Sequence, residues 1–465
     1  MVDRLSPLDA SFLHIENDVS HMHIASVAIF EGPPPPYEDI TAMVASKLPL
    51  VPRYRQVVKF VPLQLGRPVW VDDPHFNLNY HVRATALASP GSEEQLRTLV
   101  GRVMSQPLDR SKPLWEMWMV EGLDNGHWAM MSKTHHCMVD GVSGTDLLTV
   151  VLDRESDPPR PAVEDEWRPQ PQPTGAELLA DAVRERITSP YEQIRGLRAA
   201  TRAPRQAVDQ LTEVAQGVRS LAGLARATPE STINGSIGPH RRWAWARSTL
   251  ADVKTIRAGL GGTVNDVVLA AITRGFRDLL ESRGESTDRV IRTLVPVSVR
   301  VKGAAGPAQG DGTFDNKVSA MFAELPVNIT DARERLDAIH AQMGTLKESK
   351  QAVAGEALTS LTGFAPPMLL ALGTRVFSRI PQRNVNTVTT NVPGPQFPLY
   401  AGGRKMLEAF PYVPLAGSVR IGVAIFSYNG MINFGVTGDY DTAPDISVLC
   451  QGIEDGIAEM VKLSG

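Results

Sequence analysis

The chain has 465 residues, 43% of them hydrophobic and 21% charged, and its formal net charge is −4 at pH 7. This length is typical of two domains and this composition of a soluble globular protein, while the acidic balance argues against nucleic acid as a general partner. Only two cysteines occur, Cys137 and Cys450, which excludes a disulfide framework and fits a reducing cytosol. We expect no signal segment and no membrane-spanning helix, because no uncharged apolar run reaches about 18 residues.

The first part of the chain has the pattern of a mixed α/β domain. We expect a helix, a strand, a helix, a hairpin and another helix, in this order, at 5–13, 21–30, 37–48, 57–71 and 93–104. Five histidines in this part show no spacing typical of ligands: His14, His21, His23, His75 and His81. We interpret them as structural or surface residues.

The strongest signal is a pair of histidines at the end of an apolar strand. Residues 127–134 are β-prone, and His135-His136-Cys137-Met138-Val139-Asp140-Gly141 follows them directly. Asp140-Gly141 predicts a turn, and the pattern of 143–152 predicts a helix. The histidines therefore lie at a strand-to-helix corner. Only one of them can face a given cavity, because neighbouring side chains on a strand point to opposite faces.

A histidine at such a corner is suited to base catalysis, because a neutral imidazole accepts a proton near pH 7. Asp140 could orient the ring or pair with an arginine, and the sequence leaves both possibilities open. Cys137 alternates with His136 and should face away from it, so we do not expect a cysteine nucleophile. We expect no metal site either, because adjacent histidines on a strand diverge and no third ligand lies nearby.

The composition of the middle of the chain predicts a segment that connects two domains. A proline-rich, charged stretch at 154–175 indicates a solvated linker. The next segment, 176–227, consists mostly of helix-forming residues with arginines at intervals. These arginines could form a basic face for an anionic membrane surface, but a solvated helix pair between domains is the preferred interpretation.

The second half again mixes strands and helices. Residues 241–245 predict a strand, and Thr263 with Asp266 three positions later predicts a capped helix start that includes Asn265. A β-prone run ends at Arg300, which would be an ordinary surface charge unless an acidic partner lies nearby. An apolar stretch at 357–380, interrupted by two prolines, could line a core, a lipid tunnel or a membrane interface. Two alternating strands joined by Asn429-Gly430 predict a hairpin at 421–437.

Six motifs occur in the order in which a known family carries them. They are Leu5-Ser6-Pro7-Leu8-Asp9, Pro113-Leu114-Trp115, His135-His136-Cys137-Met138-Val139-Asp140-Gly141, Asn265-Asp266, Pro296-Val297-Ser298-Val299-Arg300 and Asn391-Val392-Pro393-Gly394-Pro395. On these residues the chain resembles the bacterial wax ester synthase/diacylglycerol acyltransferases over nearly its whole length. The double-histidine motif alone also occurs in chloramphenicol acetyltransferase, condensation domains and polyketide-associated acyltransferases, so the set of six specifies the family.

The resemblance implies an α/β (α+β) fold of two chloramphenicol acetyltransferase-like domains that face each other across a substrate tunnel. We expect residues 1–175 to form the domain with the double-histidine motif, 176–240 a helical linker and 241–465 the second domain. The resemblance also implies that His136 is the general base, supported by His135, and that Asp140 pairs with Arg300 in a structural role. The remaining implied residues are Gly141, Asn265 and Asp266 for substrate binding, and Pro113 and Trp115 for structure.

The implied activity is CoA-dependent transfer of a long acyl chain to a lipid alcohol. The chief reaction would convert diacylglycerol into triacylglycerol, and a further possible reaction would convert fatty alcohol into wax ester. Acyl-CoA would be a co-substrate, and no cofactor is implied. Alternatives are a polyketide-associated or condensation-type transferase with a carrier-protein donor, and a non-catalytic lipid-binding protein. Whether Asn265 donates to the oxyanion or only shapes the helix start stays open. We expect a cytoplasmic protein, peripheral at the inner membrane face or at lipid droplets.

Overall fold

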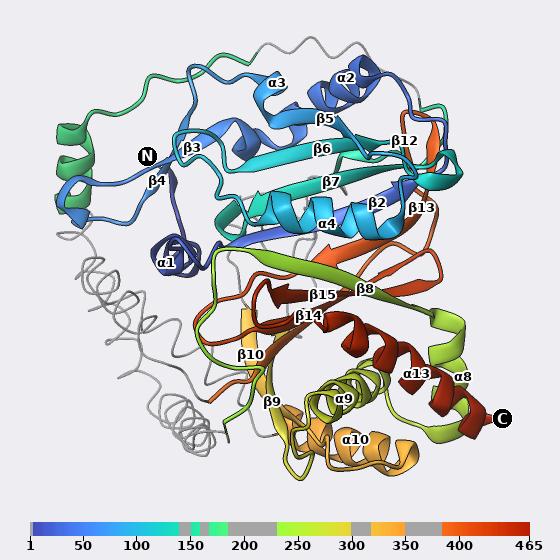
Figure 1. Cartoon of the computed structure of the whole chain (residues 1–465). Coiled ribbons are helices and arrows are strands. Elements are labelled where there is room, and N and C mark those ends of the chain that lie inside the picture. The colour runs from blue at the N-terminus through green and yellow to red at the C-terminus, as the bar shows by residue number, and fades with distance from the viewer. Residues whose placement is uncertain (1–2, 139–149, 159–166, 185–229, 299–317, 349–383) are drawn as a thin grey trace, which may run out of the picture.

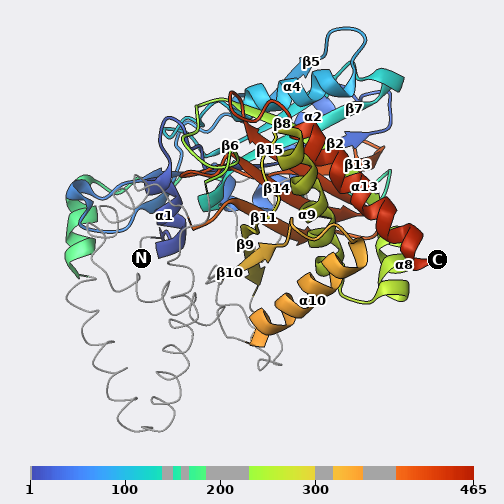
Figure 2. The same cartoon turned by 60° about the horizontal axis from the view of Figure 1, so that its bottom comes forward.

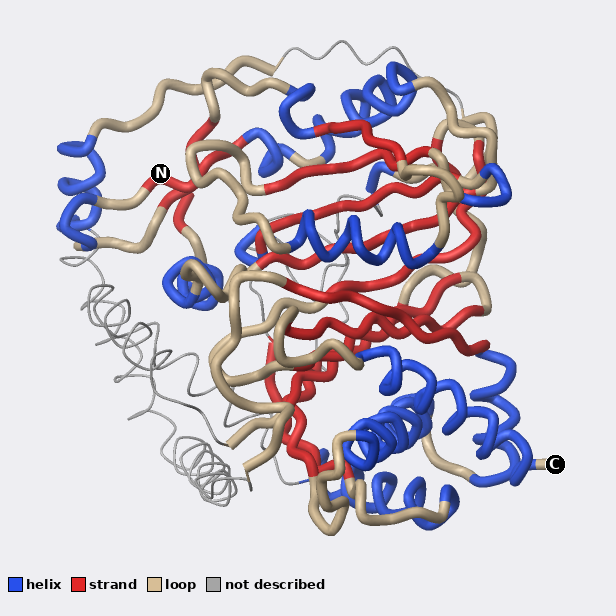
Figure 3. Tube along the Cα trace, viewed as in Figure 1, coloured by secondary structure: helices blue, strands red, loops and turns tan. Residues whose placement is uncertain are grey.

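Two six-stranded sheets, each with helices packed against it, make up most of the protein (Figures 1 and 3). The computed structural model describes residues 3–138, 150–158, 167–184, 230–298, 318–348 and 384–465. A third, three-stranded sheet lies at one side of the first sheet. The expected α/β class is therefore confirmed.

The first sheet carries the double-histidine strand near its centre. Its strand order is β12 (Tyr400–Ala401), β13 (Arg404–Tyr412), β2 (His23–Phe30), β7 (Trp128–His135), β6 (Trp115–Glu121) and β5 (Val82–Ala86). All pairs are antiparallel except β5 with β6. Alternating side chains of β2 bury Val27 and Ile29 beneath α4 (Glu93–Met104), and Ala28 and Phe30 beneath α2 (Tyr37–Lys47).

The second sheet is covered on one face by four helices (Figure 2). Its strand order is β10 (Val318–Leu325), β9 (Ile291–Ser298), β11 (Thr387–Pro393), β14 (Ile421–Tyr428), β15 (Met431–Asp439) and β8 (Arg241–Thr249). The covering helices are α8 (Leu250–Leu260), α9 (Val264–Ser282), α10 (Ala332–Glu348) and α13 (Ile446–Ser464). The largest apolar core of the described residues lies between this sheet and these helices.

Two strands from the second half of the chain lie in the sheet of the first half. Strands β12 and β13 come from the second half of the sequence, yet β13 pairs with β2 in the first sheet. A division at residue 241 therefore does not describe the sheets. The physical reason is that β13 pairs with β2, which ends at Phe30, 374 residues before β13 begins at Arg404, and such pairing leaves no local signal in the sequence.

The sheets are joined where β13 approaches β15 and β8. Asn433 Nδ2 donates to the Ala409 carbonyl at 2.9 Å, and Trp243 Nε1 donates to the Pro411 carbonyl at 3.2 Å. Gly435 lies against the same Pro411 carbonyl, where an added Cβ would come within 1.7 Å of the oxygen. Only glycine allows this approach, so β13 fixes the position of one sheet on the other.

The three-stranded sheet has the order β1 (Asp3–Arg4), β4 (Val69–Asp72), β3 (Gln56–Lys59). A helix at 175–184 packs Leu178 and Ala182 against it. The segment before this helix binds the sheet as well, because the Gln170 N–H donates to Asp72 and Lys59 donates to the Pro173 carbonyl. The end of the expected solvated linker is therefore attached to the first half. Of the expected arginine-bearing helices, only the start lies within the described residues.

Short elements complete the fold. They are the helices α1 (Pro7–Ile15) and α3 (Leu78–His81), and the 3-10 turns η1 (Leu48–Leu50), η2 (Pro52–Arg55), η3 (Pro62–Gln64), η4 (Asp124–Gly126) and η5 (His136–Met138). Most strands and helices expected from periodicity lie within two or three residues of their predicted bounds. The apolar stretch 357–380 and the predicted helix 143–152, apart from its last residues, lie outside the described residues.

Candidate active site

Strand β7 holds the two histidines at its end and is buried along its whole length. The backbone N–H of His135 donates to the Leu114 carbonyl at 2.9 Å, and that of His136 donates to the Met22 carbonyl at 2.8 Å. The chain just before β6 and the chain just before β2 therefore clamp the corner from both sides. Strand β7 ends at His135 and η5 begins at His136, while the helix expected after this corner lies almost entirely outside the described residues.

The ring of His135 is fully buried, and its tautomer follows from its contacts. Its Nδ1 accepts the backbone N–H of Cys137 at 3.1 Å, so the ring proton belongs on Nε2. That Nε2 lies 3.5 Å from Glu16 Oε2. Nδ1 of His135 is therefore occupied by a backbone N–H, and its Nε2 faces the Glu16 carboxylate.

Glu16, just after α1, is the charged centre of this support. Its carboxylate accepts from the Arg110 guanidinium at 2.5 Å and lies 3.1 Å from His23 Nε2. Burial alone would raise the pKa of Glu16, but the hydrogen bonds to His135 and His23 outweigh burial and lower the pKa well below its usual range. The carboxylate therefore remains ionised next to both rings.

His136 is the less buried of the two histidines. It is half-buried and stacks on Phe12 of α1, with the ring centroids 4.1 Å apart. Burial, aided by the neighbouring His135, lowers the pKa of His136 to about 4, against the effect of its own backbone carbonyl. The imidazole is therefore neutral at pH 7, which is the form that can accept a proton.

Cys137 is a structural residue. Its side chain is buried beside Leu13 and Leu114, and burial raises the pKa of the thiol well above its ordinary value. A thiol that stays protonated is a poor nucleophile, which agrees with the expectation from strand alternation.

The first-half motif Pro113-Leu114-Trp115 contacts this corner through the Leu114 carbonyl, which accepts from the His135 N–H. Trp115 is fully buried, donates from Nε1 to the Tyr54 carbonyl at 2.8 Å and stacks on His81. His81 Nδ1 in turn lies 2.8 Å from the Trp115 carbonyl. Pro113 is buried too.

The second-half residues form a separate group at the start of α9. Asp266 and Thr263 make the expected capping box, and Asp266 Oδ2 also lies 2.7 Å from Nδ1 of His340 on α10. Asn265 is half-buried and accepts weakly from Asn391 Nδ2 at 3.4 Å. Among the described residues, no hydrogen bond or ion pair joins this group to His135 or His136.

Three expected site residues lie outside the described residues: Asp140, Gly141 and Arg300. The predicted pairing of Asp140 with Arg300 and the predicted substrate role of Gly141 therefore stay predictions. The substrate tunnel also stays a prediction.

Comparison with known proteins identifies the family. A family model described as the wax ester synthase/diacylglycerol acyltransferase catalytic domain matches residues 5–268, and one described as the WS/DGAT C-terminal domain matches residues 314–461. The chain belongs to this family. The resemblance inferred from the six motifs is thereby confirmed, and the protein is an acyltransferase.

Relatives in this acyltransferase family match over the full length. A probable diacylglycerol O-acyltransferase of Mycobacterium tuberculosis and a putative one of Mycobacterium bovis are each 36% identical, with 100% of this chain and 96% of theirs aligned. The solved wax ester synthase/diacylglycerol acyltransferase of Marinobacter aquaeolei VT8 has a TM-score of 0.68 at 26% identity, covering 99% of this chain and 100% of that one.

More distant structures share the fold alone. The first condensation domain of the calcium-dependent antibiotic synthetase has a TM-score of 0.60 at 14% identity, covering 100% of this chain and 96% of that one. The two α/β halves expected from the resemblance are therefore an architecture that this acyltransferase family shares with condensation domains.

The sequence did not single out Glu16 and His23 as part of the site. Both lie far from the motif in sequence, Glu16 at the end of α1 and His23 at the start of β2, and they meet His135 only because β2 pairs with β7 so that His23 is opposite His135. The expectation that His23 is structural agrees with its burial, which lowers its pKa to about 3.

Proposed function

We propose that this acyltransferase moves a long acyl chain from acyl-CoA to the hydroxyl of diacylglycerol, forming triacylglycerol, and that it also accepts fatty alcohols, forming wax esters. The observation that carries the proposal is the neutral, partly buried His136 directly after a fixed strand end, in a chain whose full-length relatives are named diacylglycerol O-acyltransferases. In this proposal acyl-CoA is a co-substrate and no separate cofactor is required.

The proposed chemistry uses one base and no acyl-enzyme. His136 takes the proton from the acceptor hydroxyl while the hydroxyl oxygen attacks the thioester carbonyl. The resulting oxyanion collapses, the carbon–sulfur bond breaks, and the CoA thiolate leaves with the proton that His136 returns. A positioned base contributes about a hundred- to ten-thousand-fold, and the rest of the acceleration comes from proximity and from donors to the oxyanion.

The supporting contacts explain why two adjacent histidines are needed. His135 is tied to Glu16 and to the Cys137 backbone, so it fixes the end of β7 and leaves the next ring free. We assign the orientation of the corner to His135 and Glu16 and the proton transfer to His136. We further propose that Asn265 and Asp266 contribute to substrate binding from the second half.

None of the described helices is long and apolar enough to cross a bilayer. We propose peripheral association with the inner membrane face or with lipid droplets, because the acceptor and the product both partition into lipid. Of the segments expected to mediate this contact, 357–380 lies outside the described residues, as does most of 176–227.

The test is CoA release by the purified protein with palmitoyl-CoA and diacylglycerol, hexadecanol or no acceptor. We expect release that depends on the acceptor, with a loss of about a hundredfold or more in His136→Ala. The matched control is His75→Ala, because His75 is an exposed histidine on the same half of the chain. Release that requires an acyl-carrier protein as donor, or equal activity in His136→Ala, would contradict the proposal.

A further inference from the structure

The chain between α1 and β2, residues 16–22, contacts the double-histidine corner through its backbone. The carbonyl of Met22, the last residue before β2, accepts the His136 N–H at 2.8 Å. The Met22 N–H in turn donates to Glu16 Oε1 at 3.3 Å. The position of residues 16–22, which we call the bridging segment, therefore helps to set the position of the His136 backbone.

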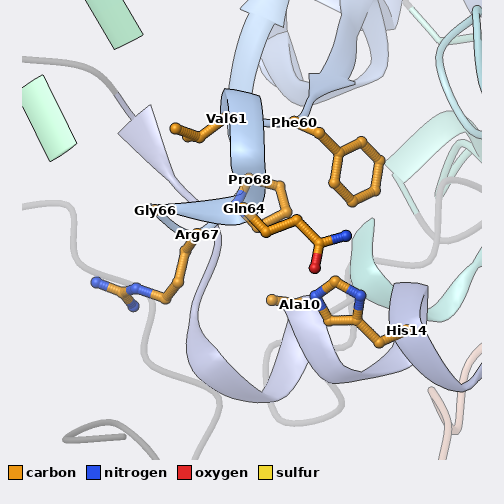
Figure 4. A pocket seen from close by; sticks show the side chains of 8 residues that line it. All are labelled: Ala10, His14, Phe60, Val61, Gln64, Gly66, Arg67 and Pro68. Carbon is orange, nitrogen blue, oxygen red and sulfur yellow. The ribbon is translucent and has the colours of Figure 1, made fainter. Parts of the chain in front are cut away.

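Contacts within the first half hold helix α1, at the start of the bridging segment. Ala10 and His14 of α1 face residues 60–68 across a shallow hollow (Figure 4). Phe12 of the same helix stacks on His136, with the ring centroids 4.1 Å apart. The segment that follows α1 therefore starts from a fixed point beside the proposed base.

The middle of the bridging segment is a tight turn built by Asn17. Asn17 Oδ1 accepts the N–H groups of Val19 and Ser20, both at 3.0 Å, and the Asn17 N–H donates to the Ser20 carbonyl at 3.1 Å. Asn17 itself is exposed. The side chain of Val19 packs against an apolar cluster from the later part of the chain: Ile237, Leu415 and Val419.

Arg241, the first residue of β8, makes a polar contact at the same point. Its side chain is buried, and its Nη2 donates to the Val19 carbonyl. Its Nη1 donates to the carbonyls of Gly238 and His240, at 2.6 and 2.8 Å. One planar guanidinium therefore joins the bridging segment to the chain that leads into the second sheet.

The backbone of Arg241 is fixed against helix α4. Its N–H donates to Ser105 Oγ at 2.8 Å, directly after the helix. Its carbonyl lies so close to Gly101 that an added Cβ there would come within 2.8 Å of the oxygen. The helix and β8 lie side by side in Figure 1. Arg241 therefore reaches Val19 from a rigid base.

The charge of Arg241 is balanced without a close carboxylate. Its ion pair with Asp439 is long, at 3.9 Å, and it hydrogen-bonds with Tyr412 as well as with the three carbonyls. Burial, and then the charge of Arg241, lower the pKa of His21 in the bridging segment. A lysine here would keep the charge, but its ammonium cannot reproduce the planar fork that reaches two stretches of backbone.

We propose that Arg241 is a positioning residue for the transfer reaction. Through the Val19 carbonyl it holds the bridging segment, and through the Met22 carbonyl this segment holds His136. The proposal rests on the proposed function, in which His136 is the base. It goes further, because it makes the position of the base depend on an arginine from the other half of the chain.

Arg241→Lys tests the proposal, because it keeps the buried charge and removes the fork. With palmitoyl-CoA and diacylglycerol we expect kcat to fall about tenfold and KM to stay within about twofold, since the base moves and the substrates bind as before. Hydrogen–deuterium exchange of the full chain gives a readout without turnover. The His136 amide should exchange faster than in wild type, and the amides of α9 should not.

Arg242→Lys is the matched control on the same strand. Arg242 donates to the Tyr440 carbonyl at 2.7 Å and lies 4.1 Å over the Tyr440 ring, so these contacts stay within the second half. The control should keep wild-type kcat and wild-type exchange at His136. An equal fall of kcat in both variants, or wild-type kcat in Arg241→Lys, would overturn the proposal.

A second variant loosens the bridging segment without touching the buried charge, and it keeps the test decisive if Arg241→Lys does not fold. Asn17→Ala removes the acceptor of the turn at an exposed position, and we expect kcat about threefold lower with faster exchange at His136. Its control is Asn77→Ala, because Asn77 Oδ1 accepts the Asn79 N–H at 3.0 Å in a similar exposed turn. Unchanged kcat in Asn17→Ala would contradict the proposal.

The two readouts also separate this proposal from the proposed function. If wild type releases no CoA with any acceptor while Arg241→Lys alone speeds exchange at His136, the contact assigned to Arg241 stands and the proposed function fails. If wild type and Arg241→Lys release CoA equally, the positioning role fails alone.

Discussion

The double-histidine corner and the start of α9 are held together by different forces. At the corner, an ionised Glu16 is buried next to His23 and His135 and accepts from Arg110. At the start of α9, Asp266 closes a capping box and contacts His340, whose side chain is 58% exposed. The contacts at the corner depend on the charge of Glu16, whereas the capping box at the start of α9 fixes the direction of the backbone. Conditions that alter charge should therefore affect the first half more than the second.

Acid should produce the largest change in the free energy of unfolding. Burial lowers the pKa of His23 to about 3 and the pKa of His81 and His136 to about 4. The unfolded chain protonates these rings near pH 6.5 and the folded chain does not, so the free energy of unfolding falls as pH falls below about 6.5. Three rings at about 1.4 kcal/mol each give a slope of up to about 4 kcal/mol per pH unit.

Urea denaturation at pH 7, 6 and 5.5 measures this slope. His81→Asn should reduce it by about one third, because it removes one of the three rings while it leaves the corner in place. A free energy of unfolding that does not change between pH 7 and pH 5.5 would show that these histidines are not held in neutral form.

Removal of the buried Glu16 carboxylate should cause the next largest loss in the free energy of unfolding. Glu16→Gln keeps the shape but leaves Arg110 and two imidazoles without their anion, and we expect a loss of about 2 to 3 kcal/mol in the free energy of unfolding at pH 7. The lower part of the usual range applies because the Arg110 side chain is 41% exposed. The control Glu94→Gln, at a 78% exposed carboxylate, should stay within about 0.5 kcal/mol of wild type. Similar losses for both variants would refute the special role of Glu16.

Substitutions at the start of α9 should lower the free energy of unfolding by less. Asp266→Ala removes the capping box and should cost about 1 to 2 kcal/mol. His340→Ala removes only the contact from α10 and should cost no more than about 1 kcal/mol, since the imidazole is largely exposed. Thermal and urea denaturation of both variants give the comparison, and a larger effect for His340→Ala than for Asp266→Ala would reverse the assigned roles.

Local sequence patterns predicted the elements that depend on local forces. The capping box of α9, the periodicity of α4 and the apolar strand β7 all appear where the pattern places them. The pairing of β13 with β2 could not be predicted, because it depends on contacts between residues far apart in the chain. For the same reason, the boundary expected at residue 241 does not coincide with the division between the two sheets.

In the candidate site too, the residues of the local motif could be predicted and those brought in by strand pairing could not. The double histidine was evident from its spacing, and the burial of Cys137 with its raised pKa agrees with the expectation of no cysteine nucleophile, although Cys137 lies in η5 and not on the strand. The contribution of Glu16 and His23 was not predictable, because nothing in their own neighbourhood in the sequence indicates that they meet His135. Their role results from strand pairing and burial, which determine which imidazoles stay neutral.

The neutral state of His136 is the central claim, and the dependence of kcat/KM on pH tests it most directly. CoA release with palmitoyl-CoA and diacylglycerol should be compared at pH 6 and pH 8, with circular dichroism to verify that the protein is folded at both. With a pKa of about 4, the base is already neutral at pH 6, so the account predicts nearly equal values. A fall at pH 6 to about one quarter of the value at pH 8 is what an ordinary imidazole with a pKa of about 6.5 would give, and it would contradict the account.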